Sequence, residues 1–294
     1  MGYDIREEGN GVVVENVRDF DPVHMLECGQ CFRWNRQNDG SYTGVAFGRA
    51  INISFQRGRL VISNTTLDDF KKVWFEYFDL GRDYAEIKKA VCRDEIMEKA
   101  IEFGSGIRLL KQDIWEVLIS FIISANNMIP RIMKTIEAIS GLFGDEIRLD
   151  NRTHYSFPGA DRLSESGLER LSLCGGGFRC RYIILASRMI KDGAVRLEGL
   201  KETGTSSARD TLMKLPGVGP KVADCILLYS ATKFDVFPTD VWVKRVMEEL
   251  YFKRRATFGE IQSFAADYFN GHAGFAQQYL FYYARANRIG RDGR

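Results

Sequence analysis

The chain has 294 residues, of which 45% are hydrophobic and 27% charged, a composition typical of a folded protein with an ordinary core. Its formal net charge is only +2, so no strongly basic field indicates a nucleic-acid partner, and any DNA-binding groups must be placed locally. No apolar run reaches the roughly 18 residues that a membrane span needs, and the first residues lack the apolar core of a signal peptide, which predicts an intracellular protein without a membrane segment.

The N-terminal part of the chain has the pattern of β-strands. From Gly11 to about Thr66, turn signals such as QNDG and QRG separate the short β-prone runs GVVV, QCFRWNR, SYTGVAFG, INISFQ and RLVIS. This pattern predicts an antiparallel sheet. After Leu67 the apolar residues follow a helical rhythm almost to the end of the chain, and we expect no strand-rich segment to return.

The cysteines do not form a recognisable metal-binding pattern. In a reducing compartment we expect all of them to be free thiols. Cys28 and Cys31 form a single CxxC, but there is no second pair and the chain has only 3 histidines, so a zinc site is not expected. The other cysteines are Cys92, Cys174, Cys180 and Cys225.

The stretch LPGVGPKVAD, residues 215–224, predicts two helices joined by a tight hairpin. Apolar residues follow a helical spacing before it, at Leu212, Met213 and Leu215, and after it, at Val222, Ile226 and Tyr229. Gly217 and Gly219 permit positive φ and close approach of another backbone, and Pro220 suits the first turn of the second helix. Free amide groups at that helix N-terminus would bind an anion such as a phosphate, although short hairpins of this kind also occur as plain helix–helix corners.

Lys221 and Asp240 are candidate reactive residues. The positive end of the helix dipole disfavours the ammonium form of Lys221, and a neutral amine is a nucleophile. The alternative is a solvated lysine that contacts phosphate as a point charge. Asp240, in the segment FPTD, precedes another helical pattern and has the position of an N-cap. One helix and one turn separate the two residues, so the amine and the carboxylate can face one cleft.

These residues carry a resemblance to a known family. LPGVGPKVAD followed by PTD resembles the helix-hairpin-helix, glycine/proline-rich loop and aspartate motif of the DNA base-excision glycosylase superfamily. Within it, the chain is most similar to the 8-oxoguanine DNA glycosylase/lyases, because GQCFRW, SFIISANNMIPRI, LCGGGFRCRY and FAQQYLF occur in the same order. The resemblance implies an α+β fold with an N-terminal antiparallel β-sheet domain, residues 1–106, followed by two mainly α-helical domains, residues 107–294, with the helix-hairpin-helix at about 207–230.

The resemblance also implies a reaction. Lys221 would attack the anomeric carbon of the sugar, expel the damaged base and form a Schiff base that permits strand cleavage by β-elimination. Asp240 would stabilise the developing oxocarbenium charge. Since the base cannot be reached inside a duplex, the nucleotide would have to flip out of the helix. The partner would be double-stranded DNA that contains 8-oxoguanine, bound by a monomer.

The family's base-binding residues match four positions of this chain. The backbone carbonyl of Gly29 would accept the N7 hydrogen that 8-oxoguanine has and guanine lacks. Gln277 would bind the Watson–Crick edge of the flipped base, while Phe281 and Cys225 would sandwich its ring. Taken alone, each of these residues has an ordinary structural interpretation as a turn, a surface amide or a core side chain.

Other positions match residues that contact the DNA. Asn126 would fill the gap left by the flipped nucleotide, Arg131 and Arg179 would contact the estranged cytosine, and Phe178 would act as a wedge. The backbone contacts would come from Gly217, Gly219 and Trp242. Three positions depart from the family pattern and bear on these contacts: Trp242 stands where histidine is common, Met128 replaces an asparagine, and Phe178 lacks a tyrosine hydroxyl.

Three alternatives remain at this point. Endonuclease III-like enzymes carry four clustered cysteines for an iron–sulfur cluster, whereas no cysteine follows Cys225 here. Alkylbase glycosylases usually lack the lysine, and a non-catalytic helix-hairpin-helix DNA-binding subunit would need neither Lys221 nor Asp240. We therefore expect no cofactor and no iron–sulfur cluster. The resemblance allows a structural cation at the hairpin carbonyls.

Overall fold

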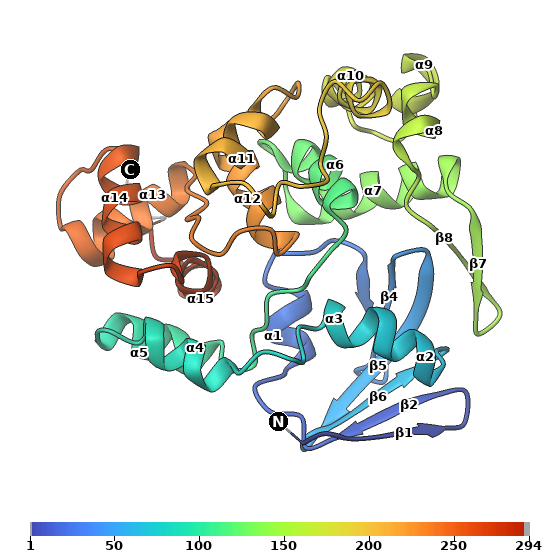
Figure 1. The fold of residues 1–294 in the computed structure, drawn as a ribbon, viewed down its shortest axis with the longest axis horizontal. Helices are drawn as coiled ribbons and strands as arrows, with labels where there is room; N and C mark the ends of the chain where they lie inside the picture. The colour runs from blue at the N-terminus through green and yellow to red at the C-terminus, as the bar shows by residue number, and fades with distance from the viewer. Residues whose placement is uncertain (1, 291–294) are drawn as a thin grey trace.

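The structure, a computed structural model, describes residues 2–290 of the chain. An antiparallel sheet lies on one side of the molecule and helices occupy the rest (Figure 1). The predicted α+β class, with an N-terminal sheet followed by a helical region, is confirmed. Within the described residues, no helix is long and apolar enough to cross a membrane.

Six antiparallel strands pair in the order β1-β2-β6-β5-β4-β3. Ile53 and Ile62 are paired in neighbouring strands, and both are fully buried. Since alternate residues of a strand point to the same face and paired residues share it, one face of the sheet is apolar. That face packs against Trp74 and Phe78 from the segment that follows the sheet. The strands are Asp4–Glu8 (β1), Gly11–Glu15 (β2), Trp34–Arg36 (β3), Tyr42–Ala46 (β4), Arg49–Gln56 (β5) and Arg59–Ser63 (β6).

The sheet begins earlier than predicted, because β1 was not expected. Its sequence, DIREE, has no alternation of apolar and polar residues, and none of its residues is fully buried. It pairs with β2 along its whole length and forms an edge of the sheet. Charged side chains are typical of edge strands, which explains why hydrophobic periodicity did not reveal this one.

Helical structure after the sheet begins at Leu67, as predicted, where the Thr66 hydroxyl accepts the Asp69 amide at 3.1 Å and caps the first turn. One short helix, Pro22–Leu26 (α1), precedes this point, between two strands of the sheet. The helical segments that follow are Leu67–Asp69 (α2), the π turn Phe70–Trp74 (η1), Phe75–Tyr77 (α3), Tyr84–Val91 (α4) and Glu95–Phe103 (α5).

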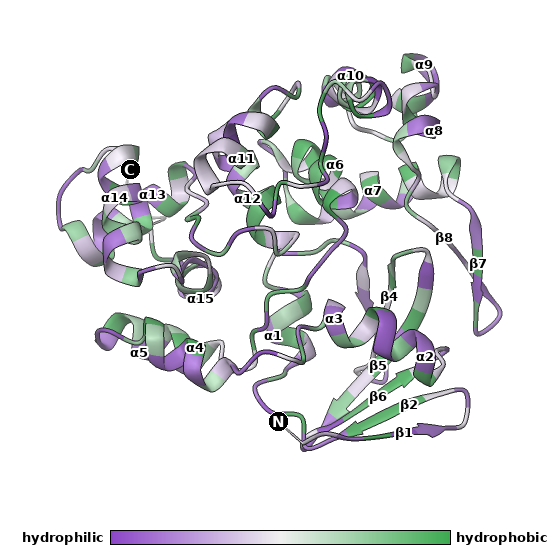
Figure 2. Cartoon of the chain, in the orientation of Figure 1, coloured by the Kyte–Doolittle hydropathy of each residue, from purple (hydrophilic) through white to green (hydrophobic). Residues whose placement is uncertain are grey.

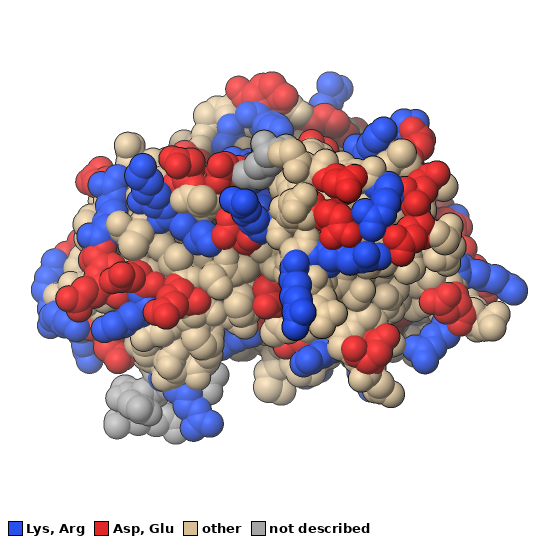
Figure 3. All heavy atoms as spheres, turned by 90° about the horizontal axis from the view of Figure 1, so that it is seen from below, with Lys and Arg blue, Asp and Glu red and all other residues tan. Residues whose placement is uncertain are grey.

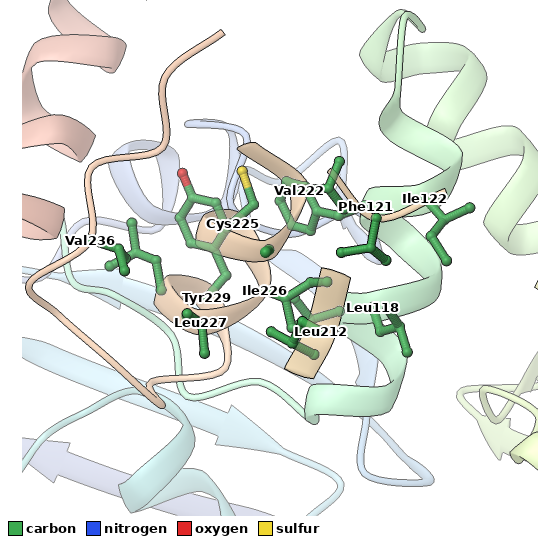
Figure 4. Close-up of a cluster of buried hydrophobic side chains, with 14 of the residues drawn as sticks. Leu118, Phe121, Ile122, Leu212, Val222, Cys225, Ile226, Leu227, Tyr229 and Val236 are labelled. Atoms are coloured by element: carbon green, nitrogen blue, oxygen red, sulfur yellow. The ribbon is translucent and has the colours of Figure 1, made fainter. Parts of the chain in front are cut away.

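The remaining helices are arranged around two buried ones. α6 is buried from Val117 to Ile123 and α12 from Val222 to Tyr229, and both are strongly hydrophobic in Figure 2. The two pack against each other, with Phe121 and Ile226 in the contact region (Figure 4). These helices are Ile114–Ser124 (α6), Ile129–Phe143 (α7), Ala160–Ser164 (α8), Leu168–Ser172 (α9), Arg179–Lys191 (α10), Thr205–Met213 (α11), Pro220–Tyr229 (α12), Val241–Met247 (α13), the π turn Glu248–Phe252 (η2), Phe258–Phe269 (α14) and Ala273–Ala286 (α15).

The expectation that no strands return after the sheet is wrong. Glu146–Leu149 (β7) and Arg152–Tyr155 (β8) form a second antiparallel pair. Asp150 and Asn151 have φ values of 48° and 58°, which is the left-handed geometry of a two-residue hairpin turn. Only Leu149 of this pair is buried, against Val45 and Ala50 of the N-terminal sheet. The hairpin therefore lacks the alternation of apolar and polar residues that predicts a strand. The Asp150-Asn151 pair, which is typical of a hairpin turn, is the sequence feature that could have predicted it.

Candidate active site

The predicted hairpin joins α11 to α12, and its two glycines differ in backbone conformation and in surroundings. Gly217 has φ +85°, and a Cβ there would lie 3.0 Å from the Tyr182 side chain, so this position requires glycine. Gly219 is an extended N-cap residue with φ −95°, and the positive φ expected of it is not found. No atom lies within 4 Å of a Cβ built on Gly219. The open space beside the N-terminus of α12 is therefore accessible to a ligand.

The first turn of α12 leaves amide groups free. Its first intrahelical bond runs from the Ala223 N–H to the Gly219 carbonyl at 2.9 Å. The amides of Lys221 and Val222 precede that bond, and Pro220 has no N–H to satisfy. The hairpin thus presents two donors at a helix N-terminus, which is the arrangement that binds an anion.

One stripe of α12 carries Lys221, Cys225 and Tyr229 at four-residue spacing, which places them on the same side of the helix. Figure 4 shows Cys225 and Tyr229 side by side. Across from the stripe, Phe121 of α6 stacks on Tyr229 with ring centroids 5.2 Å apart. The Lys221 amine lies 5.5 Å from the centroid of the Phe121 ring. An apolar wall therefore stands next to the amine.

Asp240 lies at the start of α13 and faces the same region. One of its carboxylate oxygens accepts the Val243 amide at 2.8 Å, so the residue is an N-cap. Lys221 and Asp240 together line two cavities, an open cleft of about 650 Å³ and a smaller pocket of about 150 Å³. The structure thus brings the amine and the carboxylate to one place, as their spacing predicts.

The smaller pocket contains every predicted base-binding residue. Gly29 comes from the loop after α1, Cys225 from α12, and Gln277 and Phe281 from α15. Segments that are far apart in the sequence thus meet at the predicted reactive pair. The other lining residues are Phe32, Phe121, Ser124, Asn127, Ile129, Ile132, Tyr229, Pro238 and Val243.

Two polar groups in this pocket are free to bind a ligand. The Gln277 Nε2 donates to the Pro238 carbonyl at 3.3 Å, whereas its Oε1 is buried without a partner among the described residues. Gly29 has φ +91°, and a Cβ there would lie 3.4 Å from the Phe281 ring. No donor within the described chain bonds to the Gly29 carbonyl. Unpaired acceptors that line a pocket, such as the buried Gln277 Oε1 and the partly buried Gly29 carbonyl, favour a ligand that can donate to them.

Burial raises the pKa of the Cys225 thiol to about 11, an effect that the nearby Lys221 ammonium opposes only in part. At neutral pH the residue is therefore an uncharged thiol. A neutral sulfur beside an aromatic ring forms a soft apolar surface, and planar ring systems pack well on such surfaces. Cys225 and Phe281 both line the pocket, and the sandwiching of a base ring between them stays a prediction.

Trp242 does not line either cavity. Its ring meets Phe281 edge to face, with centroids 5.1 Å apart, and its Nε1 donates to the Ile289 carbonyl at 3.0 Å. In the described structure this residue therefore supports a wall of the pocket. Its predicted contact with the DNA backbone stays a prediction.

The predicted DNA-contacting residues lie outside the pocket. Phe178 is 62% exposed and Met128 is 74% exposed, and Arg131 is also exposed. Arg179 is buried instead, and its guanidinium donates to the Ala125 and Asn126 carbonyls. Arg179 therefore holds the loop that carries Asn126. The predicted contacts of Arg131 and Arg179 with the estranged cytosine stay predictions.

Sequence reasoning missed several pocket residues, Phe121 above all. It belongs to the run SFIIS, in which every residue is apolar or small, so nothing distinguishes it from its neighbours in the core. Among the described residues, no group of three or more histidine, cysteine, aspartate or glutamate side chains is placed to hold a metal ion.

Comparisons with known proteins agree with this geometry. The family profile "8-oxoguanine DNA glycosylase, N-terminal domain" matches residues 12–118, and the profile "helix-hairpin-helix motif" matches residues 208–229. The second range contains the hairpin between α11 and α12. The first contains Gly29 and ends within α6.

Relatives with these features match most of the chain. A probable N-glycosylase/DNA lyase of Methanothermobacter thermautotrophicus is 33% identical, over 72% of this chain and 74% of its own. The structure of MBOgg1 in complex with a low-affinity DNA ligand is 49% identical and superposes with a TM-score of 0.96, over 98% of this chain and 100% of that one. The 8-oxoguanine glycosylase/lyase of Clostridium acetobutylicum, solved with double-stranded DNA containing cytosine opposite 8-oxoguanine, is 44% identical, with a TM-score of 0.95 and the same coverage.

The fold of this chain, sheet and helical region together, is thus the fold of these solved structures. The similarity extends over both the N-terminal sheet and the helical region, so it is not restricted to one motif. The chain therefore belongs to the 8-oxoguanine DNA glycosylase family of helix-hairpin-helix proteins, as a DNA glycosylase with lyase activity.

Proposed function

We propose that this protein removes 8-oxoguanine from double-stranded DNA through a Schiff base at Lys221 and then cuts the strand by β-elimination. The observation that carries the proposal is the pocket in which Lys221 and Asp240 meet Gly29, Gln277 and Phe281. The family relationship supports the substrate, since the relatives include a glycosylase/lyase solved with 8-oxoguanine DNA.

In the proposed reaction, the Lys221 ammonium first gives up a proton to solvent. The resulting neutral amine attacks C1′ of the flipped nucleotide, and the bond between C1′ and the base nitrogen breaks. The electron pair of that bond leaves with the base, which takes up a proton. The positive charge that develops on the sugar lies near the Asp240 carboxylate, which stabilises it. Opening of the sugar ring then gives an imine between C1′ and the lysine nitrogen.

The imine permits strand cleavage. Loss of a proton from C2′ allows the 3′-phosphate to leave, and hydrolysis of the imine returns the free amine. Lysine serves in both stages, because its nitrogen first replaces the base and then withdraws electrons from the sugar. No step needs an oxidant, a reductant or a metal ion.

Base selection is assigned to groups that the pocket leaves unpaired. The Gly29 carbonyl accepts the N7 hydrogen of 8-oxoguanine, and the Gln277 Oε1 accepts a donor of the Watson–Crick edge. Guanine would present the lone pair of its N7 to the Gly29 carbonyl. Sites built around one buried hydrogen bond can reject an analogue that lacks it by roughly 10⁴-fold.

Contacts with the DNA are assigned to exposed side chains and to the hairpin. The free amides at the start of α12 bind a phosphate beside Gly217 and Gly219. Phe178 wedges into the duplex and Asn126 fills the vacated position. Arg131 donates to the estranged base and favours cytosine, which offers two acceptors at O2 and N3. In this proposal the protein acts as a monomer and uses no cofactor.

Borohydride trapping tests the covalent step. A duplex with one 8-oxoguanine should give a stable protein–DNA adduct, whereas the same duplex with guanine should not. Lys221→Gln should abolish the adduct and leave DNA binding largely intact, because the glutamine side chain is polar and only one bond shorter than lysine, and its amide cannot form an imine. Undiminished trapping in Lys221→Gln would overturn the assignment of the nucleophile.

A further inference from the structure

Two glutamines, the buried Gln278 and the partly buried Gln112, hold the backbone on both sides of Gly29. The Gln278 Nε2 donates to the Cys28 carbonyl at 3.3 Å, and the Gln112 Nε2 donates to the Gln30 carbonyl at 2.7 Å. Between them, the Gly29 carbonyl accepts no hydrogen bond from the described chain. The chain thus fixes the two neighbouring peptide groups and leaves one acceptor free.

Gln278 is fully buried and has a different task from its neighbour Gln277. The Cys28 carbonyl can only accept, so the Gln278 amide must turn its Nε2 toward it. Its Oε1 then faces the Tyr229 hydroxyl, which donates to it at 2.8 Å. The Cys28 carbonyl therefore sets the orientation of the amide, and the Tyr229 hydroxyl, which can donate or accept, serves as a donor that holds the Oε1 in place.

These hydrogen bonds close into a ring. The Tyr229 carbonyl accepts both the side-chain and the backbone N–H of Gln112, at 3.2 and 3.3 Å. From Tyr229 the ring thus runs through Gln278 to residues 28–30 and returns through Gln112. Gln30 anchors it further, because its Nε2 donates to two carbonyls and its Oε1 accepts the Leu110 amide at 2.9 Å. We call this arrangement the Gly29 ring: Tyr229, Gln278, Cys28, Gly29, Gln30 and Gln112.

We propose that Gln278 and Tyr229 are positioning residues that set the direction of the Gly29 carbonyl and thereby the selectivity for a purine with a hydrogen on N7. This inference rests on the proposed function, in which that carbonyl is the acceptor. A hydrogen bond weakens steeply as its angle departs from linearity, so a carbonyl that turns freely would discriminate poorly. The Gly29 ring links the Gly29 carbonyl to α12, the helix that carries Lys221. It thereby fixes the position of the base-binding carbonyl relative to the Lys221 amine.

The test measures a ratio of affinities. In the Lys221→Gln protein, which cannot complete the reaction, dissociation constants are measured for duplexes with 8-oxoguanine, guanine or a tetrahydrofuran abasic analogue, each opposite cytosine. Adding Gln278→Leu should reduce the preference for 8-oxoguanine over guanine by about tenfold, because one buried hydrogen bond loses its geometry. The affinity for the abasic analogue, which has no base, should stay within about twofold.

Tyr229→Phe provides a milder second variant. It keeps the ring that stacks on Phe121 and removes only the hydroxyl that donates to the Gln278 Oε1, so we expect the preference to fall roughly threefold. The matched control is Tyr77→Phe, which removes a buried hydroxyl that accepts the Trp34 Nε1 at 2.7 Å in the core of the sheet. The control should lower thermal stability without changing the preference.

Each result is decisive. Unchanged preferences in both Gln278→Leu and Tyr229→Phe overturn the inference, and so does an equal loss of affinity for all three duplexes, which indicates a structural role only. A Lys221→Gln protein that shows no preference for 8-oxoguanine at all overturns the proposed function, and this inference with it, before any second substitution is made.

Discussion

The two oxygens of the Asp240 carboxylate have different surroundings. One accepts the Val243 amide, and the other has no partner among the described residues, in a region where the carboxylate lines both cavities beside Lys221. An N-cap at the end of a loop is held in one place by the helix it starts. The capping bond therefore fixes the oxygen that is assigned to the reaction.

Replacement of Asp240 by asparagine separates its role as a helix cap from its proposed role in catalysis. Asn is as good an N-cap as Asp, so Asp240→Asn should change the free energy of unfolding by about 1 kcal/mol or less. Base release should slow by at least ~10²-fold, because the charge that stabilises the sugar is lost. Single-turnover rates and thermal denaturation of the same preparation check both parts. A wild-type rate of base release would reduce Asp240 to a helix cap.

Arg131 should control the choice of the opposite base. It is exposed, whereas the Arg179 guanidinium is occupied by the Ala125 and Asn126 carbonyls. Excision of 8-oxoguanine should therefore be faster opposite cytosine than opposite adenine, and Arg131→Ala should compress that difference about tenfold, the effect of losing one charge-assisted contact. Rates with each of the four opposite bases provide the measurement. Equal rates for the unmutated protein would contradict this assignment.

At the scale of elements, a buried ion pair joins the sheet to the helices. Arg33, just before β3, lies 3.7 Å from Glu116 of α6 and also donates to the Tyr155 carbonyl of β8. Burial raises the pKa of Glu116 to about 7, and Arg33 offsets this only in part. The Arg33 guanidinium therefore links the start of β3 to both α6 and β8, and it compensates the Glu116 carboxylate only in part.

This arrangement predicts a dependence of stability on pH. The unfolded chain releases the Glu116 proton near pH 4.5, and the folded chain releases it near pH 7. The protonated group thus contributes stability that is complete below the unfolded pKa and is lost as the pH rises through 7, by about 3 kcal/mol. Urea unfolding between pH 4.5 and 7.5 should show this decline, and Glu116→Gln should remove it.

Glu260 offers a matched control. Hydrogen bonds with Thr257 lower the pKa of this carboxyl to about 2, so its contribution is lost only as the pH falls below its unfolded value. Glu260→Gln should therefore leave the decline between pH 4.5 and 7.5 intact. Parallel curves for the unmutated protein and Glu116→Gln would show that Glu116 does not titrate in that range.

At the scale of the whole molecule, positive and negative charges nearly balance. Lysine and arginine side chains alternate with aspartate and glutamate on the face shown in Figure 3, in keeping with the net charge of +2. Such a face does not attract a polyanion as a unit. The assigned DNA contacts rely instead on the hairpin amides and on a few exposed side chains.

The cysteines give a prediction for the whole protein. All six are free, and five of them are buried. Metal analysis of protein purified without chelator should find no stoichiometric iron, because an iron–sulfur cluster needs clustered thiolates. A preparation with one cluster's worth of iron per chain, or with the brown colour of such a cluster, would contradict this.

Lys221 and Asp240 could be predicted from the sequence more readily than the residues that surround them. Lys221 and Asp240 lie in segments with strong local signals, a glycine hairpin and a helix cap, and both could be placed from spacing. Phe121 and Gln278 lie within helices among similar residues, and only tertiary contacts across the chain give them a role. The edge strand β1 and the β7–β8 hairpin lack apolar alternation, so periodicity could not reveal them. The boundary at residues 106 and 107 stays a prediction; α4 and α5, before it, pack against α15.

The hydrogen bond between Gln278 and the Cys28 carbonyl spans 250 positions of the chain. During synthesis, Lys221 therefore leaves the ribosome well before the wall formed by Gln277 and Phe281 can close around it. A nascent or truncated chain that stops before α15 carries the amine and Gly29, but it lacks Gln277 and Phe281 of the pocket and the Gln278 amide that contacts the Cys28 carbonyl. The pocket therefore depends on contacts between segments far apart in the sequence, and α15 must pack against α4 and α5 before Lys221 faces a complete pocket.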